Sequence, residues 1–178
     1  MRDMKYTRLG VYDYGQFYRV GFFGHRYVEK FRETEDRLEK LIREILRKKA
    51  FVEFYVGRNG DFDQMAASTV RRIRMNGYER ECALVLVLPY VTAEYRDNED
   101  SFKNYYDDIE ICEAAEFSHP KGAFAIRNRE TVERCDLIVC CLEHEKGGAH
   151  KAVEYAKKLG KPIINVADSD LLVSEVKL

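Results

Sequence analysis

Two short segments in which every residue is apolar, ALVLVL (83–88) and LIVCCL (137–142), constrain the fold of this chain most strongly. A strand with one face in water alternates apolar and polar residues, whereas a strand covered on both faces is apolar throughout. Both segments are therefore predicted to be strands of a parallel sheet that lies between two layers of helices.

Helical patterns alternate with the predicted strands along the chain. Apolar residues recur on one helical face from Leu38 to Leu46, after an acidic first turn and before the basic residues 47–49, which suits the helix dipole. The other strands are expected at 18–24, 51–56, 108–111 and 163–166, and the other helices at 61–77, 124–134 and 149–160. This alternation predicts a mostly parallel sheet with helices on both faces.

The length of 178 residues suits a single domain covering residues 1–178, in which residues 1–16 form an N-terminal extension or an edge element. The acidic, tyrosine-rich segment 95–108 is expected to be a solvated loop that could act as a lid. No apolar run approaches the length of a membrane span, and the N-terminus lacks the apolar core of a secretion signal.

Glycine, histidine and unusually placed polar residues gather in the segments that follow the predicted strands. The carboxyl ends of parallel strands meet at one edge of a sheet, where ligands bind in open α/β folds. We therefore expect a ligand site at that edge. The segments concerned are 22–26, 56–64, 88–96, 116–123 and 142–151.

The segment VGRNGDFDQ (56–64) has the features of an anion-binding turn. Gly57 and Gly60 would let main-chain amides approach a phosphate, Arg58 could form a fork with it, and Asp61 or Asp63 could accept hydrogen bonds from ribose hydroxyls. The alternative is equally open: the glycines only form a turn, and an aspartate only caps the following helix.

A second glycine turn, Gly147–Gly148, also stands between a strand and a helix. Two such turns at one edge could offer converging amides to a phosphate, although each could also serve only for tight packing. The chain has neither a GxGxxG nor a GxxxxGK[ST] motif, which disfavours an ordinary dinucleotide site and a P-loop.

Two further groups of residues are candidates for the same site. Gly24, His25 and Arg26 follow the first strand, where the histidine could be a base, a stacking partner or an ordinary loop residue. Arg127 and Asn128, in the triplet RNR, could hold a phosphate or could lie on an exposed helix face.

Metal and disulfide chemistry are both disfavoured by the spacing of the residues. The histidines have no zinc-like spacing to one another or to a cysteine. Five cysteines, an odd number without a CxxC pair, are expected to be buried thiols in a reducing cytoplasm.

The charges of the chain argue against one class of partner. Its 30 basic and 31 acidic side chains nearly cancel, to a net charge of -1. Duplex nucleic acid is bound by proteins with a basic excess, so no duplex nucleic acid is expected as a partner.

The ordered set FFGHR, VGRNGDFD, LPY, AIRNR, CDLIV and GGAHK, which runs from about Tyr18 to Val166, resembles the YpsA-like bacterial proteins of the SLOG superfamily. This resemblance implies a Rossmann-like three-layer α/β/α sandwich. It also implies binding of a nucleotide-derived ligand such as NAD, ADP-ribose or a nucleoside phosphate, with no cofactor required.

The same superfamily includes the LOG-type phosphoribohydrolases, which carry the motif PGGxGTxxE. Here Lys146 replaces the proline, His150 and Lys151 replace the Gly-Thr pair, and Glu154 falls on the glutamate. The resemblance makes Glu154 a candidate catalytic acid, while its plain interpretation is a surface carboxylate paired along the helix with Lys157 or Lys158.

Three functions remain open on the sequence. The first is binding or sensing of a nucleotide-derived ligand; the second is hydrolysis or transfer at an N-glycosidic bond; the third is a protein-interaction scaffold with a vestigial pocket. For the first function we expect a cytoplasmic protein that binds a small molecule and does not associate with membranes. It could self-associate into a homo-oligomer.

Overall fold

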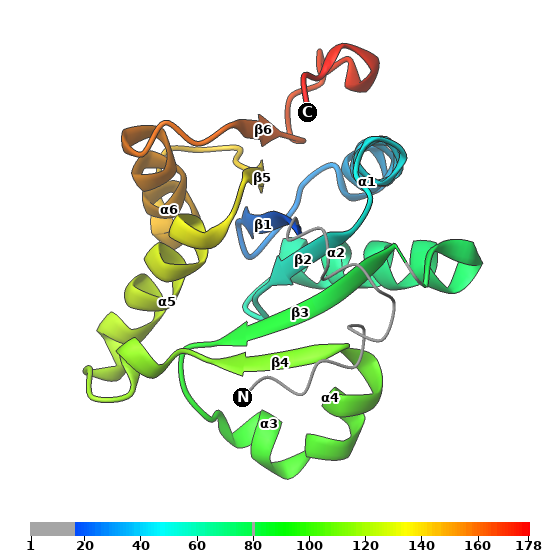
Figure 1. Cartoon of the computed structure of the whole chain (residues 1–178). Helices are drawn as coiled ribbons and strands as arrows, with labels where there is room; N and C mark the ends of the chain where they lie inside the picture. Colours follow the sequence, from blue (N-terminus) through cyan, green and yellow to red (C-terminus); the bar gives the residue numbers. More distant parts are fainter. Residues whose placement is uncertain (1–16, 80) are drawn as a thin grey trace.

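The computed structural model describes residues 17–79 and 81–178, which form one sheet of parallel strands in the order β4-β3-β2-β1-β5-β6 (Figure 1). Every pairing between neighbouring strands is parallel. The strands are β1 (Tyr18–Gly24), β2 (Val52–Val56), β3 (Cys82–Leu88), β4 (Asp108–Ile111), β5 (Leu137–Cys141) and β6 (Ile163–Asn165). The predicted Rossmann-like α/β fold is confirmed. The extension or edge element expected at 1–16 lies outside the described residues.

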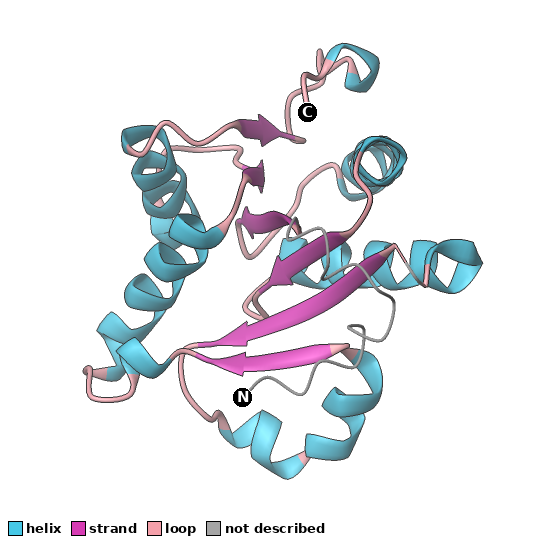
Figure 2. Cartoon of the chain, in the orientation of Figure 1, coloured by secondary structure: helices cyan, strands magenta, loops and turns pink. Residues whose placement is uncertain are grey.

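Helices cover both faces of the sheet (Figure 2). Helices α1 (Phe31–Lys48) and α2 (Asp61–Ile73) pack on one face, and α5 (Pro120–Arg134) and α6 (Gly147–Lys158) pack on the other. The short helices α3 (Ala93–Asp97) and α4 (Glu99–Tyr105) connect β3 to β4. Single turns lie at Arg74–Tyr78, Glu113–Ala115 and Val173–Glu175.

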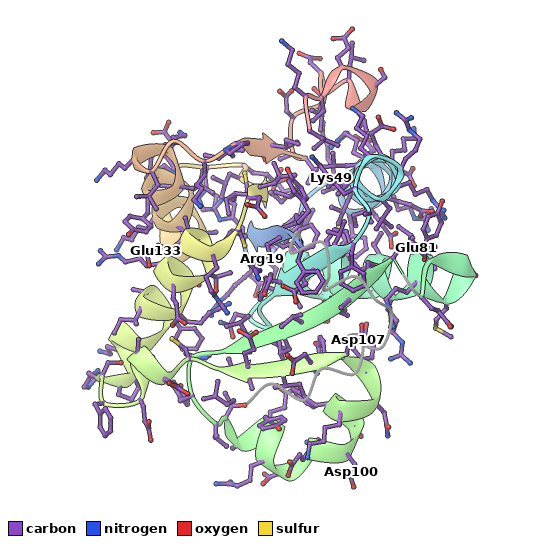
Figure 3. The ribbon with its side chains drawn as sticks, viewed as in Figure 1. Arg19, Lys49, Glu81, Asp100, Asp107 and Glu133 are labelled. Atoms are coloured by element: carbon purple, nitrogen blue, oxygen red, sulfur yellow. The ribbon has the colours of Figure 1, made fainter. Side chains whose placement is uncertain are left out.

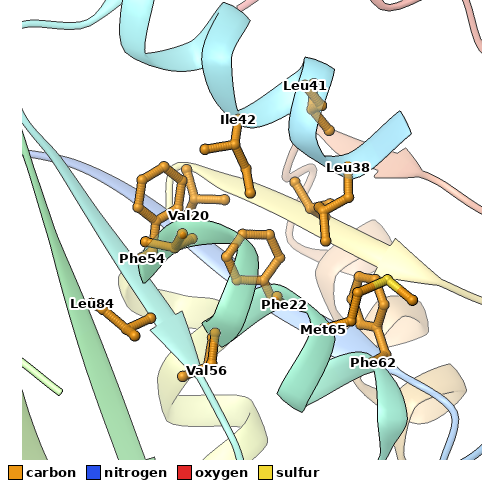
Figure 4. Packing of buried hydrophobic residues seen from close by; sticks show 14 of the residues in the cluster. Val20, Phe22, Leu38, Leu41, Ile42, Phe54, Val56, Phe62, Met65 and Leu84 are labelled. Carbon is orange, nitrogen blue, oxygen red and sulfur yellow. The ribbon is translucent and has the colours of Figure 1, made fainter. Parts of the chain in front are cut away.

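The larger core lies between the sheet and the pair α1 and α2 (Figure 4). Alternate residues of the strands point into it, because successive side chains of a strand face opposite sides of the sheet. Phe22 of β1 stacks on Phe54 of β2 with ring centroids 5.8 Å apart, and the edge of Phe62 from α2 meets Phe22. Each such buried side chain contributes about 1.5–3 kcal/mol. This core fixes the positions of the strands whose carboxyl ends form the candidate site.

The face under α5 includes a buried charge. Glu53 of β2 is 1% exposed, and it accepts hydrogen bonds from Arg19 Nε at 3.0 Å and from the Tyr55 hydroxyl at 2.7 Å. Figure 3 shows Arg19 on β1, next to the strand that carries this carboxylate. A buried carboxylate is tolerated only when it is paired and hydrogen-bonded, so this charge is structural.

The expectation of a loop at 95–108 is wrong, because the structure forms α3 and α4 there. The Thr92 hydroxyl caps α3 by accepting a hydrogen bond from the Tyr95 amide at 3.2 Å, and Phe102 is buried from α4. The many polar residues hide this helical pattern in the sequence. Helix α5 also begins earlier than expected, at Pro120, a residue that suits the first position of a helix.

The strand order reverses its direction at β1, which pairs with β2 on one side and with β5 on the other. The loop after β1 leads to a helix on one face, and the loop after β5 leads to a helix on the opposite face. Such a switch point separates neighbouring loops and opens a crevice at the carboxyl ends of the strands.

In the described residues, no helix is both long and apolar enough to cross a membrane.

Candidate functional site

A cleft of about 530 Å³ opens at the carboxyl ends of β1 and β5, and we call it the switch-point cleft. It lies where the strand order predicts a ligand site. Its lining residues are Phe22, Phe23, Gly24, His25, Arg26, Tyr27, Asn59, Asp63, Phe124, Arg127, Asn128, His144, Lys146, Gly147, Gly148 and Ala149. Eight of the thirteen residues expected at the site therefore line one cavity.

Arg127 is the most unusual residue of the cleft. It is only 6% exposed, and the described residues provide neither a hydrogen bond to its Nε nor an ion pair with its guanidinium. Burial lowers the pKa of Arg127, and the charge of Asp63 opposes that effect. An arginine keeps its charge in proteins, so a buried guanidinium without a hydrogen-bonded partner is costly unless something else satisfies it.

Helix α6 begins at the same cleft. Gly147 has a φ of +93°, a backbone conformation that favours glycine, and the side chain of the N-cap residue Lys146 forms no capping hydrogen bond. The first turn holds no acidic residue, and Lys146 lines the cleft just before it. An uncapped helix N-terminus together with a buried arginine makes one end of the cleft suited to an anion.

Asn128 and Phe124 share the face of α5 that carries Arg127. The Asn128 Oδ1 atom is buried, and no residue in the described part of the chain gives it a hydrogen bond. The Phe124 ring meets Tyr90 edge-to-face at 6.0 Å and lies 6.0 Å from the Arg127 guanidinium carbon. Tyr27, which is 80% exposed, lines the same cleft. The cleft thus combines an anion-binding end with aromatic surface.

The two glycine turns do not play the same part, and the expectation of free amides is wrong at Gly57. The Asp63 carboxylate accepts hydrogen bonds from the Asn59 amide, at 2.7 Å, and from the Gly57 backbone. Burial raises the pKa of Asp63, while Arg127 and these amides counter the rise. The protein's own carboxylate therefore occupies this turn, and the turn at Gly147 stays open.

His25 and His144 stack at the switch point, with ring centroids 3.6 Å apart and planes 15° from parallel. His25 Nε2 lies 3.1 Å from the carbonyl oxygen of His144. Burial, followed by the charge of His144, lowers the pKa of His25. His25 therefore presents a neutral imidazole to the cleft at neutral pH.

Arg58 and Asp61 do not line the switch-point cleft, and both belong to a second cavity of about 570 Å³ beside α2 and α4. Arg58 donates to Glu94 at 2.8 and 3.0 Å and to the Tyr106 hydroxyl at 3.2 Å, with its guanidinium over the Phe102 ring. Asp61 accepts from the Val28 amide at 3.3 Å. The phosphate role expected for Arg58 is corrected, because its hydrogen bonds go to the protein.

Two of the predicted glycines are required by close packing. A Cβ at Gly24 would lie 2.4 Å from the Phe62 ring, and one at Gly60 would lie 2.6 Å from Arg26 Cα. Gly24 lines the cleft, whereas Gly60 does not. Both positions let the loops after β1 and β2 approach each other, which is a structural role.

Glu154, the candidate catalytic acid, lies on α6 outside the switch-point cleft. It pairs with Lys157 at 2.7 Å, and this hydrogen bond lowers the pKa of Glu154. A general acid works best with a raised pKa, close to the working pH. The surface ion pair is the interpretation that matches its position.

The other eight residues that line the cleft were not among the predicted site residues: Phe22, Phe23, Tyr27, Asn59, Phe124, His144, Lys146 and Ala149. Phe124 stands three residues before Arg127, and the helix predicted at 124–134 already places both on one face, so helical spacing could have identified Phe124. Asn59 lies within the predicted turn at 56–64, whereas Tyr27 lies just beyond the segment 22–26 and no pattern marked it.

The cysteines are free and buried, as predicted. Burial raises the pKa of Cys135 and of Cys140 to about 12, which makes these thiols unreactive. Within the described ranges, no group of three or more His, Cys, Asp or Glu side chains could hold a metal ion.

Comparison with solved structures agrees with this fold. DNA processing protein A (DprA) from Streptococcus pneumoniae matches with a TM-score of 0.61 and 16% identity, over 88% of this chain and 53% of that chain. TM1055 matches with a TM-score of 0.54 and 18% identity, over 88% and 83%. A Chlamydomonas Moco carrier protein matches with a TM-score of 0.51 and 14% identity, over 86% and 77%.

At 14–18% identity, these matches show a shared Rossmann-like fold. The chain spans about half the length of the DprA chain that it matches. No protein-family model and no curated protein matches the sequence.

Proposed function

We propose that this protein binds or senses a nucleotide-derived ligand, and that it holds the ligand's phosphate in the switch-point cleft between Arg127 and the first amides of α6. The observation that carries the proposal is the buried Arg127 side chain at the cleft, whose Nε has no hydrogen-bond partner among the described residues. A phosphate oxygen is the partner that a guanidinium fork matches best.

The surrounding charges and rings support this ligand class. Arg26 and Lys146 add positive charge to the cleft, and the N-terminus of α6 adds a partial one. Tyr27 and Phe124 offer aromatic surface for a planar base. A ligand with a phosphate and a base, such as AMP or ADP-ribose, suits both ends.

Binding is favoured over N-glycosidic hydrolysis by the carboxylates. Among the described lining residues the acid is Asp63, and it is engaged by the backbone of Gly57 and Asn59. Glu154 lies elsewhere and pairs with Lys157. Hydrolysis would need a carboxyl group free to exchange a proton at the sugar.

We also propose that the protein is YpsA-like and cytoplasmic, and that it needs no cofactor. One structural neighbour is named a DNA processing protein and another a Moco carrier. Nucleic acid, a molybdenum cofactor and nucleotides all carry phosphate, so the test includes ligands beyond mononucleotides.

The experiment is isothermal titration of the full chain with AMP, ADP-ribose, NAD and a short single-stranded oligonucleotide. The matched variants are Arg127→Met, which removes the buried charge, and Arg129→Met, which removes an exposed charge of the same helix over the Tyr155 ring. We expect binding of at least one nucleotide by the parent chain and by Arg129→Met, and a loss of about tenfold or more in Arg127→Met.

Two results would overturn the proposal. One is that no phosphate compound binds; the other is that a nucleotide binds equally well to Arg127→Met. Turnover of the nucleotide by the parent chain, lost in Glu154→Gln, would instead support the hydrolase. Tight binding of the oligonucleotide alone would assign the cleft to nucleic acid.

A further inference from the structure

Asn128 is the second residue of the switch-point cleft whose hydrogen-bonding capacity is unused. Its Oδ1 atom is buried, and the described residues provide no hydrogen bond to that atom. A Cβ at Gly148 would lie 4.0 Å from Asn128 Nδ2, so the amide stands beside the first turn of α6. The side chain is therefore next to the phosphate position proposed above.

The chemistry of the unsatisfied atom limits its partner. An amide oxygen accepts hydrogen bonds and cannot donate them, so it repels a phosphate oxygen and needs a hydroxyl or amino group. A buried polar atom without a partner costs free energy, which a ligand donor placed here would recover. The neighbouring Arg127 Nε is an unsatisfied donor and needs the opposite, an acceptor.

We propose that Asn128 is a specificity-determining residue, which accepts a hydrogen bond from a ribose hydroxyl while Arg127 holds the phosphate of the same ligand. Arg127 and Asn128 are consecutive in α5 and both line the cleft, so the ligand must carry an acceptor anion and a donor close together. A phosphorylated sugar with free hydroxyls has this pair of groups. The ligand class is therefore narrowed to ribose phosphates and ribonucleotides, an inference that rests on the proposed function.

The test compares AMP with 2′-deoxy-AMP and 3′-deoxy-AMP, which differ only in one hydroxyl. In the parent chain we expect one deoxy compound to bind about tenfold more weakly than AMP, the effect of one lost hydrogen bond. In Asn128→Leu, which keeps the size but not the acceptor, we expect AMP and the deoxy compounds to bind within about twofold of one another. The exposed Asn104 of α4 provides the control, Asn104→Leu, which keeps the discrimination.

The outcomes separate this inference from the proposed function. If Arg127→Met abolishes AMP binding while Asn128→Leu leaves the discrimination unchanged, the phosphate site stands and the role of Asn128 is overturned. An equal loss for all three nucleotides in Asn128→Leu would mean that the amide contacts the phosphate, which also overturns it. Binding of no nucleotide at all removes the proposed function and the inference together.

The fold of the variant is checked separately. Asn128→Leu removes an unsatisfied buried acceptor, so we expect its circular dichroism spectrum and thermal midpoint to match those of the parent chain. Asn128→Ser, which retains a short acceptor, gives a second measurement and should keep part of the discrimination.

Discussion

His25 and His144 join the two strands at which the sheet changes direction. Their imidazole rings stack with centroids 3.6 Å apart, one ring following β1 and the other following β5. The amide of His25 also donates to the carbonyl oxygen of Cys141 at 3.3 Å. The stacked rings therefore connect the end of β1 to the end of β5 within the switch-point cleft.

This stack predicts a pH dependence of stability. Burial and the charges of His144 and His150 lower the pKa of His25 from 6.5. The charge of Glu143 and the hydrogen bond to the His144 backbone oppose this decrease. As the pH falls below 6.5, the unfolded chain takes up this proton before the folded chain does. The free energy of unfolding should therefore fall until the pH passes the folded-state pKa.

Chemical denaturation of the parent chain and of His25→Gln, at about pH 7.5 and about pH 5.5, measures the effect. We expect the variant to lose less stability between the two pH values than the parent. Proton NMR should report a His25 pKa below 6.5 in the free protein, and a higher one when AMP brings its negative charge into the cleft. A free-state pKa above 6.5 would contradict the prediction.

Arg127→Met should bind phosphate compounds poorly and yet leave the unliganded protein at least as stable. No hydrogen bond of the Arg127 side chain to the described residues is lost in the variant, and the buried, unsatisfied Nε carries a cost of about 1–3 kcal/mol. Asp63 keeps its two backbone hydrogen bonds in the variant. Urea denaturation should give an unchanged or higher free energy of unfolding.

The opposite result has a clear meaning. A fall of more than about 1 kcal/mol in Arg127→Met would show that the arginine serves as the counter-ion of Asp63. In that case Asp63→Asn should restore stability to the double variant. Excess AMP, which stabilises the parent chain by mass action, should not stabilise Arg127→Met.

Glu154→Gln should leave both the ligand affinity and the stability of the protein close to those of the parent chain. Its partner Lys157 is three residues away on an exposed helix face, where solvent screens the ion pair and its contribution is small. The measurement is the same AMP titration, together with thermal unfolding. A tenfold change in the AMP affinity of Glu154→Gln would contradict this prediction and show that Glu154 contributes to the ligand site.

The sequence predicted the fold well because its strongest signals are local. The uniformly apolar strands β3 and β5 and the one-sided pattern of α1 follow directly from burial on two faces or one. The loop predicted at 95–108 failed because α3 and α4 are short and polar. What stabilises them is the burial of Phe102 and Tyr106 against residues distant in sequence.

The candidate site was predicted as a region more accurately than as a set of contacts. The ends of β1 and β5 place His25 and Gly148 at one edge of the sheet, whereas Arg127 reaches the cleft from the middle of α5. The direction of a side chain depends on its tertiary partners. Arg58 points toward α3 and α4 because it donates hydrogen bonds to Glu94 and Tyr106, and Asp63 points toward the Gly57 turn because its carboxylate accepts hydrogen bonds there. Neither choice leaves a signal in the local sequence.

Gly57→Ala should weaken phosphate binding without unfolding the chain. A Cβ at Gly57 would lie 2.7 Å from Arg127 Nη1 and 3.0 Å from Asp63 Oδ2, so the guanidinium must move away from its present position. The flexible end of an arginine can shift at a modest cost, of about 1–3 kcal/mol for such overpacking. We expect AMP affinity to fall about tenfold.

The control for Gly57→Ala is Gly122→Ala, because a Cβ at Gly122 meets no atom within 4 Å and the residue lies inside α5. Alanine is favoured over glycine in a helix by about 0.5–1 kcal/mol, so this variant should be more stable and bind AMP normally. Titration and thermal unfolding of both variants check the pair. Parent-like affinity in Gly57→Ala would show that the phosphate does not depend on the present position of Arg127.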